Sequence, residues 1–165
     1  MCIRDRRYVY ENRPDDRTRH ALYARWSHQF TQDVLHLSYR YYTDDWGIDS
    51  HTVDAKYRWE LGSRSYLEPH LRYYTQSAAD FYNTSLIDGE SVQYASADYR
   101  LGDLTTTTIG LKYGYALSNK SELGLRIESI TQSIDPSRVI GNQSQQDLTP
   151  DIEAMMIQAS YILQF

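Results

Sequence analysis

The sequence predicts an all-β fold: a transmembrane antiparallel up-and-down β-barrel with about eight strands in this chain, as part of a larger barrel. Apolar and polar residues alternate over many segments, and a period of two is the strand period. The chain stops on an aromatic residue, Phe165, and holds sixteen Tyr and three Trp, which suit the aromatic girdles of such barrels. The residues near strand ends that we expect in the girdles are Trp26, Tyr41, Trp46, Tyr57, Trp59, Tyr66, Tyr73 and Tyr115.

The strands predicted in the N-terminal half alternate clearly. Leu35, Leu37 and Tyr39 are each followed by a polar residue, and Tyr57 and Trp59 lie between charged neighbours. Each run has the length of about ten residues that a tilted strand needs to cross a bilayer. We place these strands near residues 4–11, 18–29, 33–43, 51–61 and 65–76.

The C-terminal half continues the pattern to the last residue. We place strands near residues 105–117, 122–130 and 152–165. In the last of them Tyr161, Leu163 and Phe165 share one face. A terminal aromatic on the more apolar face is typical of the signal that the bacterial barrel-assembly machinery recognises. We therefore expect these three residues to form an assembly signal.

The connections between the predicted strands alternate in length. We expect the short polar turns at residues 29–32, 62–64 and 118–121 to lie at the periplasmic end of the barrel. We expect the segments 12–17, 44–50, 77–104 and 131–151 to lie at its outer end. A membrane strand over Val92–Leu101, with Gly102-Asp103 as its turn, would invert every upstream connection. We therefore expect this segment to be an ordered part of the outer loop, either a hairpin outside the bilayer or a segment folded back onto the rim or lumen.

The polar face of the predicted sheet is too charged for a dry core, so we expect it to face the barrel lumen. Its near-balanced charges leave two interpretations open, a lattice of structural ion pairs or a wetted pore with slight anion preference. A soluble ligand-binding β-barrel has the same periodicity with its faces exchanged and remains an alternative. The expected lumen-facing polar residues are Arg25, His36, Arg40, Asp54, Lys56, Arg58, Glu68, Arg72, Lys112, Arg126 and Glu128.

The composition argues against several other classes of protein. The mean hydropathy is −0.66 and no apolar run is long enough for a transmembrane helix. The net charge of −5 and the lack of a basic stripe argue against nucleic acid as a partner. A single cysteine, Cys2, excludes a disulfide framework and a Cys-based zinc site. We expect a non-enzymatic protein without a cofactor, either porin-like or structural.

Two groups of residues could still carry chemistry. His36 and Ser38 share a strand face, so a barrel-wall hydrolase is a second alternative, although no carboxylate is placed by sequence to orient His36. Acidic residues of the outer loops could bind Ca²⁺ or Mg²⁺, but no spacing matches a calcium loop, and we expect them to be solvated. These are Asp44, Asp45, Asp80, Asp88, Glu90, Asp98 and Asp103. The histidines show no metal-ligand spacing, and we expect no metal site.

The first seven residues lack the apolar stretch of a secretory signal. We therefore expect the single domain, residues 1–165, to be the C-terminal portion of a longer precursor.

A resemblance to a known family rests on four segments, Asn12–His20, Tyr39–Ile48, Tyr94–Leu101 and Gly110–Gly114. They resemble the C-terminal portion of a family of Gram-negative outer-membrane proteins, domain-of-unknown-function family 3570, and the likeness covers nearly the whole chain. The resemblance implies a larger barrel and an upstream secretory signal, and it supplies no activity or catalytic residue. We accordingly expect the bacterial outer membrane as the location, with its lipid and lipopolysaccharide as partners.

Overall fold

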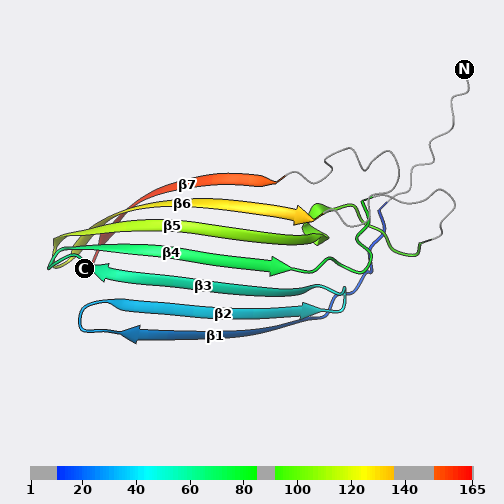
Figure 1. Ribbon diagram of the computed structural model, residues 1–165, viewed down its shortest axis with the longest axis horizontal. Coiled ribbons are helices and arrows are strands. Elements are labelled where there is room, and N and C mark those ends of the chain that lie inside the picture. Colours follow the sequence, from blue (N-terminus) through cyan, green and yellow to red (C-terminus); the bar gives the residue numbers. More distant parts are fainter. Residues whose placement is uncertain (1–10, 85–91, 136–150, 165) are drawn as a thin grey trace, which may run out of the picture.

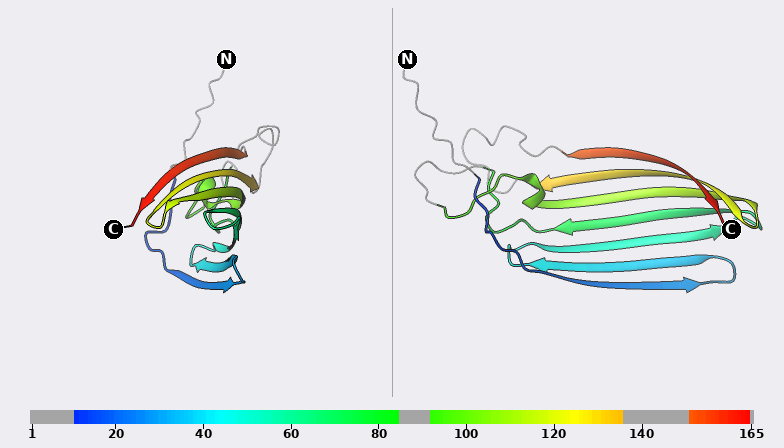
Figure 2. Two further views of the ribbon diagram at one scale, coloured as in Figure 1. Left: turned by 90° about the vertical axis from the view of Figure 1, so that its left-hand side faces the viewer. Right: turned by 180° about the vertical axis from the view of Figure 1, so that it is seen from behind.

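A computed structural model of the chain describes residues 11–84, 92–135 and 151–164. In these residues, seven strands form one antiparallel up-and-down sheet whose order follows the chain (Figure 1). The sheet is bent into an arc (Figure 2), and β1 and β7 are its two edges, so the described sheet is not closed into a barrel. The strands are β1 (Arg19–Gln29), β2 (Val34–Asp44), β3 (Asp49–Glu60), β4 (Ser65–Gln76), β5 (Asp103–Ser118), β6 (Ser121–Asp135) and β7 (Ile152–Leu163).

The seven strands predicted within the described residues are confirmed. The largest difference in bounds is at β6, which continues to Asp135 instead of ending near residue 130. It continues because Ile134 pairs with Leu104 of β5 and both side chains are buried. The predicted first strand, 4–11, lies outside the described residues except for Glu11, which is not in a strand.

The connections also follow the predicted parity. The turns at residues 30–33, 61–64 and 119–120 lie at one end of the sheet. The connection at 45–48, which is as short as two of these turns, and the much longer connection from β4 to β5 lie at the other, which we call the long-loop end (Figure 1). Val92–Leu101 is not a membrane strand, because β4 pairs directly with β5. The described residues of this segment do not form a hairpin of their own either. Ala95 and Ser96 make isolated bridges to Asn12 and Tyr82, and a short 3-10 helix, η1, follows at Tyr99–Leu101.

One face of the sheet carries mostly apolar side chains and the other mostly polar ones. Aliphatic side chains occupy the middle of one face, such as Leu71 beside Ile109 and Leu111 beside Ile127. Aromatic side chains form a row on each side of this aliphatic band. The row nearer the long loops contains Tyr39, Tyr41 and Tyr73, and the row nearer the short turns contains Tyr57, Trp59, Tyr113, Tyr115 and Tyr161.

Three residues expected in the girdles lie elsewhere. Tyr66 is on the polar face, because it is separated from the charged residues of β4 by an even number of positions. Its side chain is buried. Trp46 lies in the loop after β2, where its ring packs edge-on against Phe81 at 5.1 Å. Trp26 is opposite Leu37, in the row of the aliphatic band.

On β5 and β6 burial is inverted relative to a water-soluble protein. On β6 the apolar Leu125 and Ile127 are each 46% exposed, whereas Glu128 is 6% exposed. On β5 the exposed fraction of Ile109 is 62%. The described residues contain no helix that is long and apolar enough to span a membrane.

Among the described residues, a conventional hydrophobic core is found at the long-loop end. It consists of Ile48, Ala79, Phe81, Tyr82 and Leu101, with Trp46 and Tyr42 packed against it. These residues belong mainly to segments 45–48, 77–84 and 92–102, which we call the loop cap. Backbone hydrogen bonds join its segments, among them those from Ala79 N to Leu101 O at 2.8 Å and from Asp80 N to Trp46 O at 2.9 Å.

Candidate functional site

The polar face of the sheet is the candidate functional surface. The strand register places all eleven predicted polar residues on it: Arg25 on β1; His36 and Arg40 on β2; Asp54, Lys56 and Arg58 on β3; Glu68 and Arg72 on β4; Lys112 on β5; Arg126 and Glu128 on β6. That this face lines a lumen stays a prediction.

At the centre of this face, His70 lies between two carboxylates. Its Nε2 is 2.8 Å from Asp54 Oδ2 and its Nδ1 is 2.8 Å from Glu128 Oε1. Both ring nitrogens of His70 therefore lie within hydrogen-bond distance of a carboxylate oxygen. His70 thereby links strands β3, β4 and β6. Sequence reasoning missed this residue, although it alternates with Leu71 on the polar side of β4.

Two glycines of β5 make such long contacts possible. Gly110 lies between His70 and Glu128 in the register, and a Cβ at this position would come within 2.7 Å of Glu128 Cγ. A Cβ on Gly114 would come within 2.2 Å of Tyr66 Cε1. Side chains of β4 therefore pass over β5 and reach β6. The signal in the sequence is the pair of glycines four residues apart at polar-face positions of one strand.

Further ion pairs fill the half of the polar face nearer the short turns. Tyr66 donates to Glu122 Oε1 at 2.6 Å, and Lys112 Nζ lies 3.6 Å from the same oxygen. Arg126 lies 3.7 Å from both Glu68 and Glu128. Charges that leave bulk water are tolerated when they are paired in this way, so this half of the face is a continuous polar lattice.

In the described part of the chain, no hydrogen bond joins His36 to Ser38, the two residues of the predicted hydrolase alternative. Nδ1 of His36 is 2.8 Å from Ser27 Oγ and 3.4 Å from an Arg25 guanidinium nitrogen. Within the described residues, no hydrogen bond joins His36 to a carboxylate. The orienting group that a nucleophile-activating histidine uses is therefore not supplied by this part of the chain.

The loop cap is attached to the polar face at its long-loop end. Gln76, at the end of β4, donates from Nε2 to the carbonyl oxygens of Arg100 at 2.9 Å and Gly102 at 3.0 Å. Asp98 accepts from Arg100 at 2.6 Å and from Arg13 at 3.1 Å. The hydrogen bonds from Arg100 lower the pKa of Asp98 from 3.8 to about 2, against the effect of burial. The segment around Asp98 thus folds back over the rim of the sheet.

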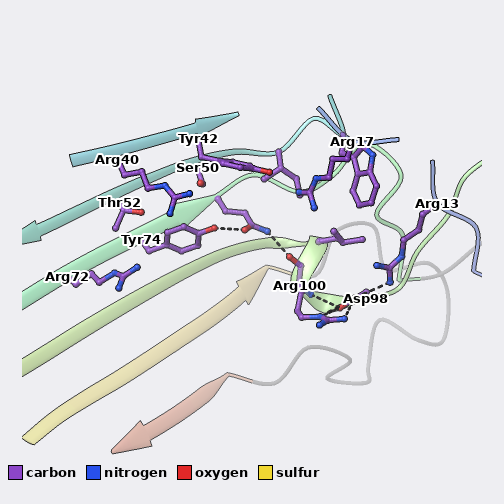
Figure 3. A pocket seen from close by; sticks show the side chains of 14 residues that line it. Arg13, Arg17, Arg40, Tyr42, Ser50, Thr52, Arg72, Tyr74, Asp98 and Arg100 are labelled. Carbon is purple, nitrogen blue, oxygen red and sulfur yellow. Dashed lines mark hydrogen bonds and ion pairs between the residues drawn. The ribbon is translucent and has the colours of Figure 1, made fainter. Parts of the chain in front are cut away.

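A hollow of about 490 Å³ lies between the loop cap and the polar face (Figure 3). Tyr42, Ser50, Thr52, Tyr74 and Gln76 contribute to its walls from β2, β3 and β4. Five arginines also line it, namely Arg13, Arg17, Arg40, Arg72 and Arg100. Only Arg40 and Arg72 were expected on this face. The other three come from segments without periodicity, so no sequence pattern placed them here.

The acidic loop residues do not form a metal site in the described part of the chain, where no group of three or more His, Cys, Asp or Glu side chains is placed to hold a metal. Asp44 instead organises the turn after β2. It accepts from Arg17 Nε at 2.9 Å, from Tyr42 at 2.7 Å and from the backbone amides of Trp46 and Ile48. Asp88 and Glu90 lie outside the described residues.

The predicted assembly signal is described in part. Tyr161 and Leu163 lie on the apolar face of β7, opposite Leu123 and Ser121 of β6. Phe165 lies outside the described residues. Recognition by an assembly machinery stays a prediction.

A family model whose description is "Protein of unknown function (DUF3570)" matches residues 2–163. Neither a search of curated proteins nor one of solved structures finds a match.

Proposed function

The chain belongs to the family described as "Protein of unknown function (DUF3570)". Because that description names no activity, we propose a function from the exposure of the apolar and polar faces of the sheet. The chain forms part of the wall of a transmembrane β-barrel in the bacterial outer membrane. It is non-enzymatic and acts as a porin-like channel or as a structural component. Lipid contacts the apolar face, and the polar face is turned to the barrel interior.

The observation that carries this proposal is the inverted exposure of β5 and β6. Their apolar face is about half exposed, while Glu128 on the opposite face is buried. Exposed large apolar side chains occur on all seven strands, whereas water-soluble monomers rarely expose contiguous apolar patches larger than a few hundred Å². A soluble ligand-binding barrel would bury this face inside, so the pattern favours lipid as its surroundings.

The aromatic rows give the apolar face the dimensions of a membrane barrel. On β4 the row of Tyr73 is six residues from that of Leu67, which pairs with Tyr113. At ~3.3 Å per residue this separation is roughly 20 Å. The apolar band of an outer-membrane barrel is about 25 Å tall between its girdles. Strands of 11 to 16 residues are long enough to cross it.

The two edges of the described sheet, β1 and β7, support a wall that continues beyond them. Unpaired backbone groups of β1 and β7 cannot be left in hydrocarbon, so a membrane sheet must close. We propose that further strands complete the barrel between these two edges. The polar lattice then stabilises the interior of one part of the wall.

Membrane fractionation followed by planar-bilayer recording tests the proposal. The chain, produced with a secretory signal, should sediment with outer membranes, resist carbonate extraction and require detergent for release. Stable conductance steps would support the porin-like form, and insertion without conductance would support the structural form. Recovery in the carbonate-soluble fraction would contradict both.

A further inference from the structure

The arginines of the hollow differ in whether they are neutralised. Arg100 and Arg13 pair with Asp98, and Arg17 pairs with Asp44. Arg40 and Arg72 line the same hollow, yet within the described residues neither makes an ion pair or a side-chain hydrogen bond. The hollow is therefore lined by two guanidinium groups that pair with no carboxylate of the described residues.

The strands hold these two groups beside a row of hydroxyls. Arg40 of β2 lies opposite Thr52 of β3, which lies opposite Tyr74 of β4. Arg72 precedes Tyr74 by two residues and so shares its face. Figure 3 shows Arg40 and Arg72 on the sheet side of the hollow, with Arg100 on the loop side. Because all these positions except Arg100 are in paired strands, their backbone is fixed before any ligand enters.

We propose that this hollow binds a small water-soluble oxyanion, a solute that carries phosphate or carboxylate groups. Arg40 and Arg72 bind its oxygens, and Thr52 and Tyr74 donate further hydrogen bonds. Guanidinium is the side-chain group best matched to the paired oxygens of phosphate and carboxylate. A volume of about 490 Å³ is within the range of small-molecule sites.

The inference rests on the proposed function in one respect, that the polar face is in contact with water. The phosphates of lipopolysaccharide surround a barrel on the outside of its wall, beyond the apolar face. The expected ligand is therefore a solute that enters from the barrel interior. Held beneath the loop cap, such a site would select anions at one mouth of the barrel.

Calorimetric titration of the detergent-purified chain with inorganic pyrophosphate tests the site. We expect saturable binding, weakened about tenfold or more in the Arg40→Gln/Arg72→Gln variant, since charge-assisted hydrogen bonds are lost. The matched control is Arg64→Gln/Lys120→Gln, which removes the same charge from the short-turn end and should bind as the unaltered chain does. Absence of saturable binding to the unaltered chain, or equal weakening in both variants, would overturn the inference.

Two additions make the outcomes separable. Arg40→Lys/Arg72→Lys keeps both charges but loses the paired donors, so it should weaken binding less than the glutamine variant and serves if that variant fails to fold. Purified lipopolysaccharide should not displace pyrophosphate, and displacement would assign the site to lipid phosphate instead. Membrane insertion without pyrophosphate binding refutes the oxyanion site alone, whereas binding by a carbonate-soluble chain refutes the membrane proposal alone.

Discussion

The sheet and the loop cap differ in whether their apolar side chains are exposed or buried. In the loop cap, Phe81 and Leu101 are buried among other apolar residues, as in any protein folded in water. In the sheet, Leu125 and Ile127 are exposed while Glu128 is covered by its polar neighbours. Burial therefore follows opposite patterns in the two regions, and the proposed membrane location accounts for the difference by giving each region a different solvent. Truncation, charge and pH should therefore act differently on the two regions.

Removing the same side chain from each region should give the largest contrast. Leu101→Ala leaves a cavity in the loop cap and should cost about 2–5 kcal/mol of local stability. Leu125→Ala on the apolar face should cost well under about 1 kcal/mol, because lipid replaces the lost contact. Hydrogen exchange at the Ala79 amide, which bonds to Leu101 O, measures the first effect. Equal costs would mean that the two residues share one environment.

A charge should be tolerated on only one face of β5. Leu111→Arg places a cation in the aliphatic band and should cost about 2 to 4 kcal/mol at mid-bilayer. Lys112→Gln, its neighbour on the polar face, loses one contact to Glu122 and should still assemble. Guanidinium unfolding in lipid vesicles checks both variants. Assembly of Leu111→Arg together with failure of Lys112→Gln would reverse the face assignment.

The glycine positions of β5 should resist enlargement. Gly114→Ala brings a Cβ into the ring of Tyr66 and should cost about 1–3 kcal/mol through overpacking. Adding Tyr66→Leu should relieve the contact, so the double variant should be less destabilised than the sum of the two single variants. Guanidinium unfolding in lipid vesicles measures the stability of the two single variants and the double variant. Strict additivity would show that the two residues do not meet.

The smallest effect is the acid sensitivity of the loop cap. The pKa of Asp98 falls on folding from 3.8 to about 2, so its contribution to stability is complete above pH 3.8 and is lost as the pH falls through 2. Fluorescence of Trp46, which packs on Phe81, should report loosening of the cap in this range. In Asp98→Asn this acid transition should disappear. An unchanged transition in the variant would assign it to another group.

Sequence periodicity was sufficient for the sheet but not for the loop cap. β4 occupies Ser65–Gln76 as predicted, because alternation is a property of single strands and needs no partner. Trp46 was predicted in a girdle and lies in the cap core, since loop segments without a period give no information about which way a side chain points. The return of the Asp98 segment onto the rim was anticipated only as one of two possibilities.

The polar site was predictable as a surface but not as a set of contacts. Parity alone placed Arg40, Asp54 and Glu128 on one face. The link from Asp54 through His70 to Glu128 depends on the register of three pairings and on the missing side chain of Gly110, which no single strand reveals. The same applies to Tyr66, whose aromatic ring suggested a girdle although its parity already placed it on the polar face.

The central claim, that the apolar face meets lipid and the polar face meets water, is tested most directly by labelling two neighbouring residues of β5. In a Cys2→Ser background, Leu111→Cys and Lys112→Cys each receive a fluorescent thiol label, and the protein is reconstituted with lipids that carry a quencher in their acyl chains. We expect strong quenching at position 111 and little at 112, with a water-soluble quencher giving the reverse. Equal quenching at both positions, or stronger lipid quenching at 112, would contradict the account.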